Sequence, residues 1–239
     1  SYIKFIKLVL PQAIIFENVH GFTVNFKGKK GTKQYSSYVE RALKRLGYRT
    51  MHQIVDMSEY GVPQNRKRFI LVAMKDHSPR KVFDVLNRNR KSFCESKGIT
   101  CKTTVYEAIS DLEKVHGTRP SPDTKGFQAG IYGPIQSGYQ KLMRQGVESK
   151  TDEVDSHRFV NHRKDTVALH NDLLLRAPAG KRITPKDNIV SNLNRRGVTV
   201  LNRDAQAPTI TSIPDEIVHY AEPRILTVRD HCLLYTSPS

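Results

Sequence analysis

Two short clusters of residues have types and spacings that could do chemistry. The first is Phe16-Glu17-Asn18-Val19-His20-Gly21, in which a carboxylate directly follows the apolar run Ala13–Phe16. A carboxylate after a buried strand lies at the sheet edge where α/β proteins place ligand sites. Taken alone, these residues are explained more simply by a turn that Glu17 and Asn18 begin.

The second cluster is Gly61-Val62-Pro63-Gln64-Asn65-Arg66-Lys67-Arg68-Phe69, directly before an apolar run. In an extended chain, alternation places Gln64, Arg66 and Arg68 on one face. Two neighbouring guanidinium groups repel each other unless an anion lies between them, and phosphate suits arginine because it accepts bidentate hydrogen bonds. The cluster therefore predicts an anion site; the alternative is a solvated basic face.

The charge of the whole chain agrees with an anionic partner. The 239 residues include 39 Lys and Arg against 23 Asp and Glu, a formal net charge of +16. Such a surplus favours a polyanion, most simply nucleic acid. The sequence shows neither an apolar run near the roughly 20 residues that span a bilayer nor a signal peptide. Three cysteines are too few for a disulfide framework, which favours a reducing, intracellular setting.

The elements that position the two clusters follow from hydrophobic periodicity. Apolar residues at helical spacing predict a helix over 2–10, and a second helix is expected to begin at a Ser37-x-x-Glu40 capping box and to end at Gly47. Ala13–Phe16 and Met51–Met57 are expected to be strands. Phe69–Met74, six apolar residues in a row, is expected to be a central strand covered on both faces. Helices and strands in this order indicate an α/β layered domain.

The pattern changes after Pro79. Thr104 and Glu107 form a second capping box that opens a short helix. Residues 115–138 are rich in Gly, Pro, Ser and Thr, and residues 152–202 are polar, basic and weakly periodic. We expect loops and short strands in both stretches.

Together, and in this order, the motifs resemble the DNA (cytosine-5) methyltransferase family. Glu17-Asn18-Val19 is weak alone, but it is followed by Gly61-Val62-Pro63-Gln64-x-Arg66-x-Arg68. Near the end, Arg224-x-Leu226-Thr227-x-Arg229-Asp230 is similar to the family's Arg-x-Leu-Thr-x-Arg-Glu motif, with Asp for Glu. The resemblance covers roughly residues 2–230, with weaker landmarks at 108–112, 161–162 and 207–211.

The resemblance implies a partial Rossmann-like S-adenosylmethionine-dependent methyltransferase sheet plus an irregular, mixed, mostly β target-recognition region. It implies methyl transfer from S-adenosylmethionine to carbon 5 of a flipped-out cytosine in duplex DNA. Glu17 matches the acid that protonates ring nitrogen 3, which requires a raised pKa in a closed, largely dry pocket. Arg66 and Arg68 match the pair that binds the base oxygen and phosphate and braces the catalytic loop. Supporting roles fall to Asn18, Val19 and Gln64.

By position, residues 79–205 correspond to the family's DNA-reading region. Basic side chains there are expected to contact phosphates more than bases. The candidate DNA-binding residues are Arg158, Arg163, Lys164, Arg195 and Arg196. The resemblance implies that Arg224, Thr227 and Arg229 are structural, in a return segment (206–231) that leads back into the catalytic domain begun by residues 1–78.

Three departures from the family pattern shape the expected activity. The nucleophilic Pro-Cys loop and the glycine-rich cofactor loop, both expected upstream of Glu17, are missing, so most of the cofactor site is expected outside this chain. Cys94, Cys101 and Cys232 are expected to be buried small hydrophobic residues, without zinc or another metal. Residues 232–239 are expected to be a non-native tail. We therefore expect a piece of a methyltransferase that is inactive alone.

Two alternatives remain open from the sequence. One is a tRNA-directed member of the same family, which ranks lower because its Cys-Phe-Thr signature is absent. The other is a non-catalytic DNA-binding module derived from the fold. In either case we expect a monomer, located inside the cell with its nucleic acid and away from membranes.

Overall fold

A computed structural model describes residues 2–28, 31–146, 153–191, 193, 197–210 and 213–235. The chain divides into two compact units. The first unit comprises Ser1–Met57 and Arg66–Ser92, and the second comprises Ser58–Asn65 and Phe93–Ser239. The domain boundaries expected at residues 78, 205 and 231 stay predictions.

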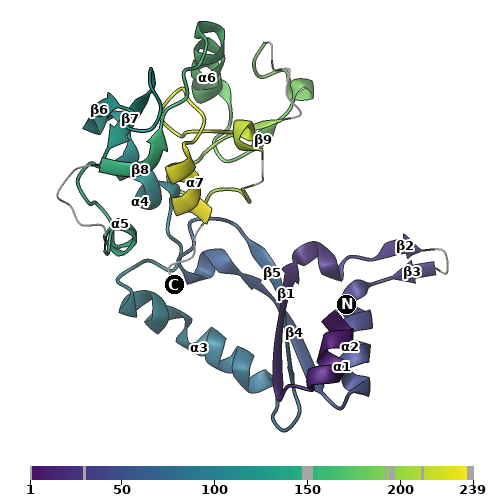
Figure 1. Ribbon diagram of the computed structural model, residues 1–239. Coiled ribbons are helices and arrows are strands. Elements are labelled where there is room, and N and C mark those ends of the chain that lie inside the picture. Colours follow the sequence, from purple (N-terminus) through teal and green to yellow (C-terminus); the bar gives the residue numbers. More distant parts are fainter. Residues whose placement is uncertain are drawn as a thin grey trace. The chain divides into compact units, whose positions relative to one another are not determined.

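A three-stranded antiparallel sheet forms the centre of the first unit (Figure 1). Its strands are β1 (Ala13–Val19), β4 (Arg49–Asp56) and β5 (Lys67–Met74), in the order β1-β5-β4. The central place of β5 confirms the prediction for Phe69–Met74, and Phe69, Leu71, Val72 and Ala73 are all buried. Since both neighbours run antiparallel to β5, the carboxyl end of β1 meets the amino end of β5.

Two helices cover one face of this sheet, and a third lies on the other side (Figure 1). The helices α1 (Tyr2–Val9) and α2 (Tyr35–Arg45) bury Ile6, Val39 and Leu43 against the strands. The third helix, α3 (Arg80–Ser96), buries Phe83. A hairpin of β2 (Phe26–Gly28) and β3 (Gly31–Lys33) precedes α2.

The expected capping box at Ser37 and Glu40 is wrong. The helix α2 begins two residues earlier, at Tyr35, and its N-cap residue Gln34 makes no side-chain cap hydrogen bond. The Ser37 hydroxyl instead donates to Gln34 Oε1 at 2.6 Å, and Glu40 Oε1 lies 2.5 Å from His52 Nδ1. The glutamate is therefore used in a contact with β4 rather than at the helix terminus.

Short strands and helices make up the second unit. One sheet has the order β6-β7-β8, and another has the order β11-β10-β9. Together with the first unit, these small sheets give the mixed α/β architecture that the fold class predicted. The strands are β6 (Thr118–Pro120), β7 (Gln128–Ile131), β8 (Glu153–Arg158), β9 (Arg182–Ile183), β10 (Val198–Val200) and β11 (Ile217–Val218).

The helices of the second unit include one that the sequence did not predict, α6, within the stretch expected to be irregular. Thr104 is the N-cap residue of helix α4, and its predicted capping box with Glu107 is confirmed. The helices are α4 (Val105–Ile109), α5 (Gly138–Met143), α6 (Lys164–Arg176) and α7 (Val228–Tyr235), with 3₁₀ turns at Ser110–Leu112, Lys114–His116, Pro185–Asp187 and Pro214–Glu216; two others, His20–Thr23 and Met57–Tyr60, lie earlier in the chain.

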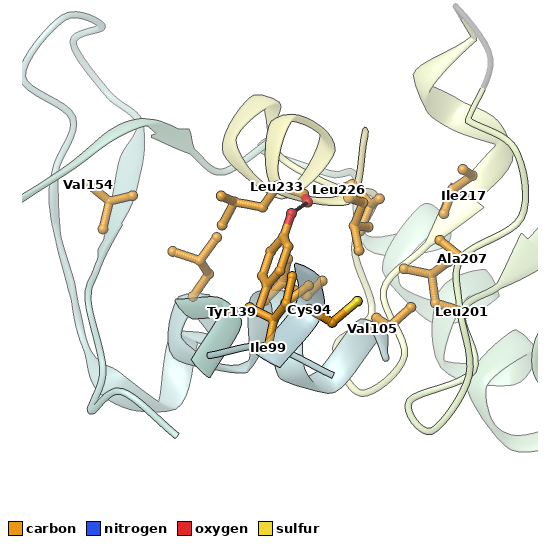
Figure 2. Close-up of a cluster of buried hydrophobic side chains, with 14 residues drawn as sticks. Cys94, Ile99, Val105, Tyr139, Val154, Leu201, Ala207, Ile217, Leu226 and Leu233 are labelled. Carbon is orange, nitrogen blue, oxygen red and sulfur yellow. Dashed lines mark hydrogen bonds between the residues drawn. The ribbon is translucent and has the colours of Figure 1, made fainter. Parts of the chain in front are cut away.

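A hydrophobic core joins α4, α5 and α7 in the second unit (Figure 2). Tyr139 lies at its centre, and its hydroxyl donates a hydrogen bond of 2.6 Å to the carbonyl of Leu233. Leu233 and Leu234 are both buried there, so residues 232–235 continue α7 as packed helix. Whether residues 232–239 are native stays a prediction, and 236–239 lie outside the described residues.

The three cysteines differ in burial. Cys94 is buried in the core of the second unit, as predicted, and Cys101 is half-buried. Cys232 is exposed, so the prediction of a buried side chain is wrong there. Its position on α7 turns it away from the core that its neighbours Leu233 and Leu234 fill.

Candidate functional site

Glu17 and Arg68 meet on one face of the first unit's sheet. Glu17 lies on β1 opposite Ile70 of β5, and Arg68 lies two residues earlier on β5, opposite Val19. Residues two apart on a strand point to the same face. The Arg68 Nε atom consequently lies 2.8 Å from Glu17 Oε1. The sequence predicted both residues, but it placed Glu17 after the strand, whereas the structure places it inside β1.

This face of β1 is open. The side chain of Glu17 is 56% exposed, while that of Arg68 is 11% exposed. Ile15 and Val19, which share the face with Glu17, are 71% and 55% exposed. The described residues of the first unit therefore do not form the closed, dry pocket that was expected around Glu17.

Asn18 makes a local contact at the end of β1. Its Oδ1 accepts a hydrogen bond of 2.8 Å from the backbone N–H of Val19. This contact holds the chain where the strand turns into the 3₁₀ turn His20–Thr23. It agrees with a supporting, loop-orienting role for Asn18, which stays a prediction.

Gln64 lies in different surroundings from Arg68. Its side chain is fully buried in the second unit, and its segment pairs with Ala207 through backbone hydrogen bonds of 2.8 and 2.9 Å from Asn65 N and Ala207 N. Strand β5 begins only at Lys67, so the expected alternation of Gln64, Arg66 and Arg68 on one strand face is wrong. Arg66 is half-buried in the first unit, and its carbonyl accepts a 2.9 Å hydrogen bond from Met57 N.

A glycine in the same motif is required by its surroundings. Gly61 has φ +85°, and a Cβ atom there would lie 2.4 Å from Ile99 Cδ1. Any L-residue would be strained and would collide with this core side chain. The Gly-Val-Pro-Gln segment thus has a packing role within the second unit.

The Arg224–Asp230 motif caps helix α7. Thr227 Oγ1 accepts from Asp230 N at 3.2 Å, and Asp230 Oδ2 accepts from Thr227 N at 2.8 Å. Arg224 Nη1 adds a 2.6 Å contact to the same carboxylate, and both charged side chains are buried. Burial raises the pKa of Asp230, but the Arg224 guanidinium overrides it and holds that pKa well below its usual range. Asp230, where the family pattern has Glu, is long enough to complete this cap.

The third member of the motif, Arg229, points elsewhere. Its Nη2 atom donates a 2.7 Å hydrogen bond to the Tyr132 hydroxyl. These contacts agree with the structural role predicted for Arg224, Thr227 and Arg229, which stays a prediction.

Two buried histidines adjoin this motif, and the sequence analysis did not single them out. His157 Nε2 donates to the Leu112 carbonyl at 2.8 Å, and its Nδ1 lies 2.8 Å from Thr227 Oγ1. His219 Nδ1 accepts from the backbone N–H groups of Ala221 and Glu222, at 3.1 and 3.2 Å. Burial lowers the pKa of both imidazoles, that of His219 to about 3. The sequence gives little signal for them, because a single histidine outside a motif or a periodic pattern does not indicate burial.

The structure describes three of the five predicted DNA-binding residues. Arg158, at the end of β8, is exposed, and its guanidinium lies 4.4 Å from the centre of the Phe127 ring. Arg163 and Lys164 are exposed where α6 begins. Arg195 and Arg196 lie outside the described residues. The DNA-binding roles of all five stay predictions.

Two further features were searched for in the described part of the chain. It contains no group of three or more His, Cys, Asp or Glu side chains that could hold a metal ion. None of its helices is long and apolar enough to cross a membrane.

Comparisons with known proteins connect this geometry to one group of enzymes. The family model for C-5 cytosine-specific DNA methylase matches residues 1–239. The Type II methyltransferase M.XorII of Xanthomonas oryzae pv. oryzae is 26% identical over 249 residues, which cover 99% of this chain and 53% of that protein. The Type II methyltransferase M.DdeI of Desulfomicrobium norvegicum is 29% identical over 155 residues, 61% of this chain and 32% of that protein.

A solved structure shares the fold. It is that of a protein from E. coli assigned as a prophage-encoded DNA modification methyltransferase, with a TM-score of 0.55 and 15% sequence identity. The match covers 98% of this chain and 61% of that one. The chain thus spans about half the length of M.XorII, and about a third of M.DdeI.

Proposed function

Because the chain belongs to the C-5 cytosine-specific DNA methylase family, we propose that it serves in methyl transfer from S-adenosylmethionine to carbon 5 of a flipped-out cytosine in duplex DNA. The observation that carries the proposal is the 2.8 Å contact between Arg68 and Glu17 on one open sheet face. A carboxyl group and a guanidinium on the same face can together bind the polar edge of a base. The carboxyl group can donate a proton, and the guanidinium can stabilise negative charge on the base.

The proposed role of Glu17 imposes an order of events. A general acid must donate to its substrate, but the Glu17 carboxyl group contacts the Arg68 guanidinium in this structure. We propose that, when DNA binds, the base oxygen or a phosphate replaces the Glu17 carboxyl group as the partner of Arg68. Glu17 then becomes protonated and donates to ring nitrogen 3 of the cytosine, while Arg68 stabilises the oxygen of the same ring.

The described residues do not fit S-adenosylmethionine. The face around Glu17 is exposed at Ile15 and Val19, so no cradle encloses an adenosine or a methionine group there. We therefore propose that most of the cofactor site, and the nucleophilic cysteine, are contributed by residues other than these.

The second unit supports the DNA side of the proposal. Arg158, Arg163 and Lys164 are exposed in it, and we propose that they contact DNA together with Arg195 and Arg196, most of them through phosphates. The net charge of +16 favours such contacts. We propose a monomer that works inside the cell, on DNA.

Two alternatives are tested by the same assay. A tRNA-directed enzyme would methylate tRNA, and a non-catalytic module would bind DNA without methylating it. The test is methyl transfer by the full-length protein that contains these residues, measured with radiolabelled S-adenosylmethionine on duplex DNA and on tRNA. We expect label in DNA only. Label in tRNA alone, or none despite DNA binding, would overturn the proposal.

A further inference from the structure

A hollow of about 440 Å³ lies on the three-stranded sheet β6-β7-β8 of the second unit. The strands are side by side in Figure 1. Its volume falls within the range of roughly 300–1,000 Å³ that is usual for ligand sites. Besides the buried His157, the polar residues that line it are Arg119, Ser121, Asp123, Asp155, Ser156 and Arg158.

An irregularity in β8 builds this hollow. Ala129 pairs with Arg158 and Ile131 with Glu153, so two steps along β7 correspond to five along β8. Within this bulge, Ser156 has φ +58°, a conformation that is unusual for a residue other than glycine. A regular strand would point alternate side chains to opposite faces. The bulge instead brings Asp155, Ser156 and Arg158 to the same hollow.

His157 anchors the bulge from inside. It is 1% exposed, and its two ring nitrogens contact Leu112 O and Thr227 Oγ1, both at 2.8 Å. Its ring packs over Gly130 of β7, where a Cβ atom would lie 2.4 Å from His157 Cδ2. Strained backbone held by such buried contacts is a feature of binding sites, because it keeps neighbouring side chains in fixed positions.

The charges that line the hollow decide what it can bind. Two arginines and two aspartates line it. Asp123 Oδ1 accepts from the Ser121 hydroxyl at 2.7 Å, whereas Asp155 is exposed on the bulge. Carboxylates repel phosphate oxygens, so the hollow is unsuited to the DNA backbone. It offers donors and acceptors together, as the edge of a base pair requires.

Resting on the proposed function, we propose that this hollow reads a G·C base pair in the major groove of the target DNA. Arginine donates bidentately to guanine O6 and N7, and aspartate accepts from cytosine N4. Arg158 is the guanine reader, and Asp155, three residues before it, is the acceptor for cytosine. An A·T pair does not present two adjacent acceptors on one base, so it satisfies Arg158 less well. His157 is a positioning residue that holds both readers.

The test selects randomised duplex DNA with this chain and sequences the bound fraction. We expect one position at which G·C is enriched by the wild-type chain. In the variant R158A that preference falls by roughly 5- to 150-fold, the range for one bidentate base contact. D155A should weaken the same position and no other, because it removes the acceptor for cytosine N4. Both side chains are exposed, and circular dichroism checks that the variants fold.

A matched control and a modified base separate base reading from general attraction. R163A removes an exposed arginine outside the hollow, and we expect it to weaken all duplexes alike. Replacing the selected guanine by 7-deazaguanine removes only N7. It should weaken the wild-type chain several-fold and leave R158A unchanged, because the contact is already lost.

The outcomes also separate this inference from the proposed function. Binding of duplex DNA with no G·C preference, or with a preference that R158A retains, overturns the inference and leaves the proposed DNA substrate standing. A chain that binds no duplex DNA at low salt overturns the inference together with the DNA-binding role proposed for the second unit.

Discussion

Arg68 Nε lies 2.8 Å from Glu17 Oε1. The two residues are about fifty positions apart in the sequence and lie on the neighbouring antiparallel strands β5 and β1. The pair is unequal, because Arg68 is nearly buried and Glu17 is half exposed. An ion pair with one exposed partner contributes about 0–1 kcal/mol to stability. The pair therefore adds little to the stability of the fold, which agrees with the binding role proposed for both residues.

Replacing Glu17 by Gln should abolish most of the activity and leave the fold intact. Glutamine cannot donate the proton that general acid catalysis needs, and such a loss costs about 10²–10⁴-fold in rate. The measurement is single-turnover methyl transfer by the full-length protein. Thermal unfolding should change little, and a rate within a few-fold of wild type would remove Glu17 from the chemistry.

Replacing Asp230 by Asn should destabilise the second unit by about 1.5–3 kcal/mol, because it weakens the charge-assisted contact to the buried Arg224, which still pairs with Glu222 at 2.5 Å. Urea unfolding measures the change. The control is D204N, an exposed aspartate, for which we expect less than about 0.5 kcal/mol. Equal effects of the two variants would show that the Arg224–Asp230 contact does not stabilise α7.

Stability should fall as the pH is lowered from 7 to 5. The buried imidazoles of His157 and His219 have a lowered pKa, that of His219 about 3, whereas an unfolded histidine has a pKa of about 6.5. Between these values the unfolded chain binds protons that the folded chain does not. Within this window His219 lowers the free energy of unfolding by about 1.4 kcal/mol per pH unit, and His157 acts in the same direction.

Urea unfolding at several pH values checks this slope. In H219Q, the slope of the free energy of unfolding against pH, measured between pH 6 and 5, should fall by about 1.4 kcal/mol per pH unit. This difference does not depend on the absolute stability of the variant. Burial also raises the pKa of Asp111, whose contribution to stability has the opposite dependence on pH, so the comparison with H219Q isolates the share of His219. A slope that H219Q leaves unchanged would assign the pH dependence to other groups.

The chain of 239 residues should transfer no methyl group to DNA on its own. Cys94 is buried in the core, and neither Cys101 nor Cys232 lies in a Pro-Cys motif. The measurement is incubation with radiolabelled S-adenosylmethionine and duplex DNA, beside the full-length protein. Transfer at a rate comparable to that of the full-length protein would show that a nucleophile is present among these residues.

Local sequence patterns predicted a helix terminus or a strand correctly where the residues that form it lie close together in the chain. The capping box at Thr104 formed because Glu107 has its partner atoms within the same turn. The expected box at Ser37 has the same type of motif, Ser-x-x-Glu, but Glu40 contacts His52 on β4 instead. A tertiary contact outcompeted a local one, and the sequence alone does not reveal that competition.

The sequence by itself determined the family and the central strand Phe69–Met74, and it singled out Glu17, Arg68 and Arg224 as candidate site and motif residues. Ordered motifs and apolar runs are local properties, so they can be recognised without coordinates. Only the tertiary structure decided that Glu17 lies within a strand beside Arg68, that Gln64 is buried against residues near Ala207, and that His157 anchors a bulge under Arg158. These depend on pairing register and on contacts between residues far apart in the chain, which the free energy of the whole fold selects rather than any local preference.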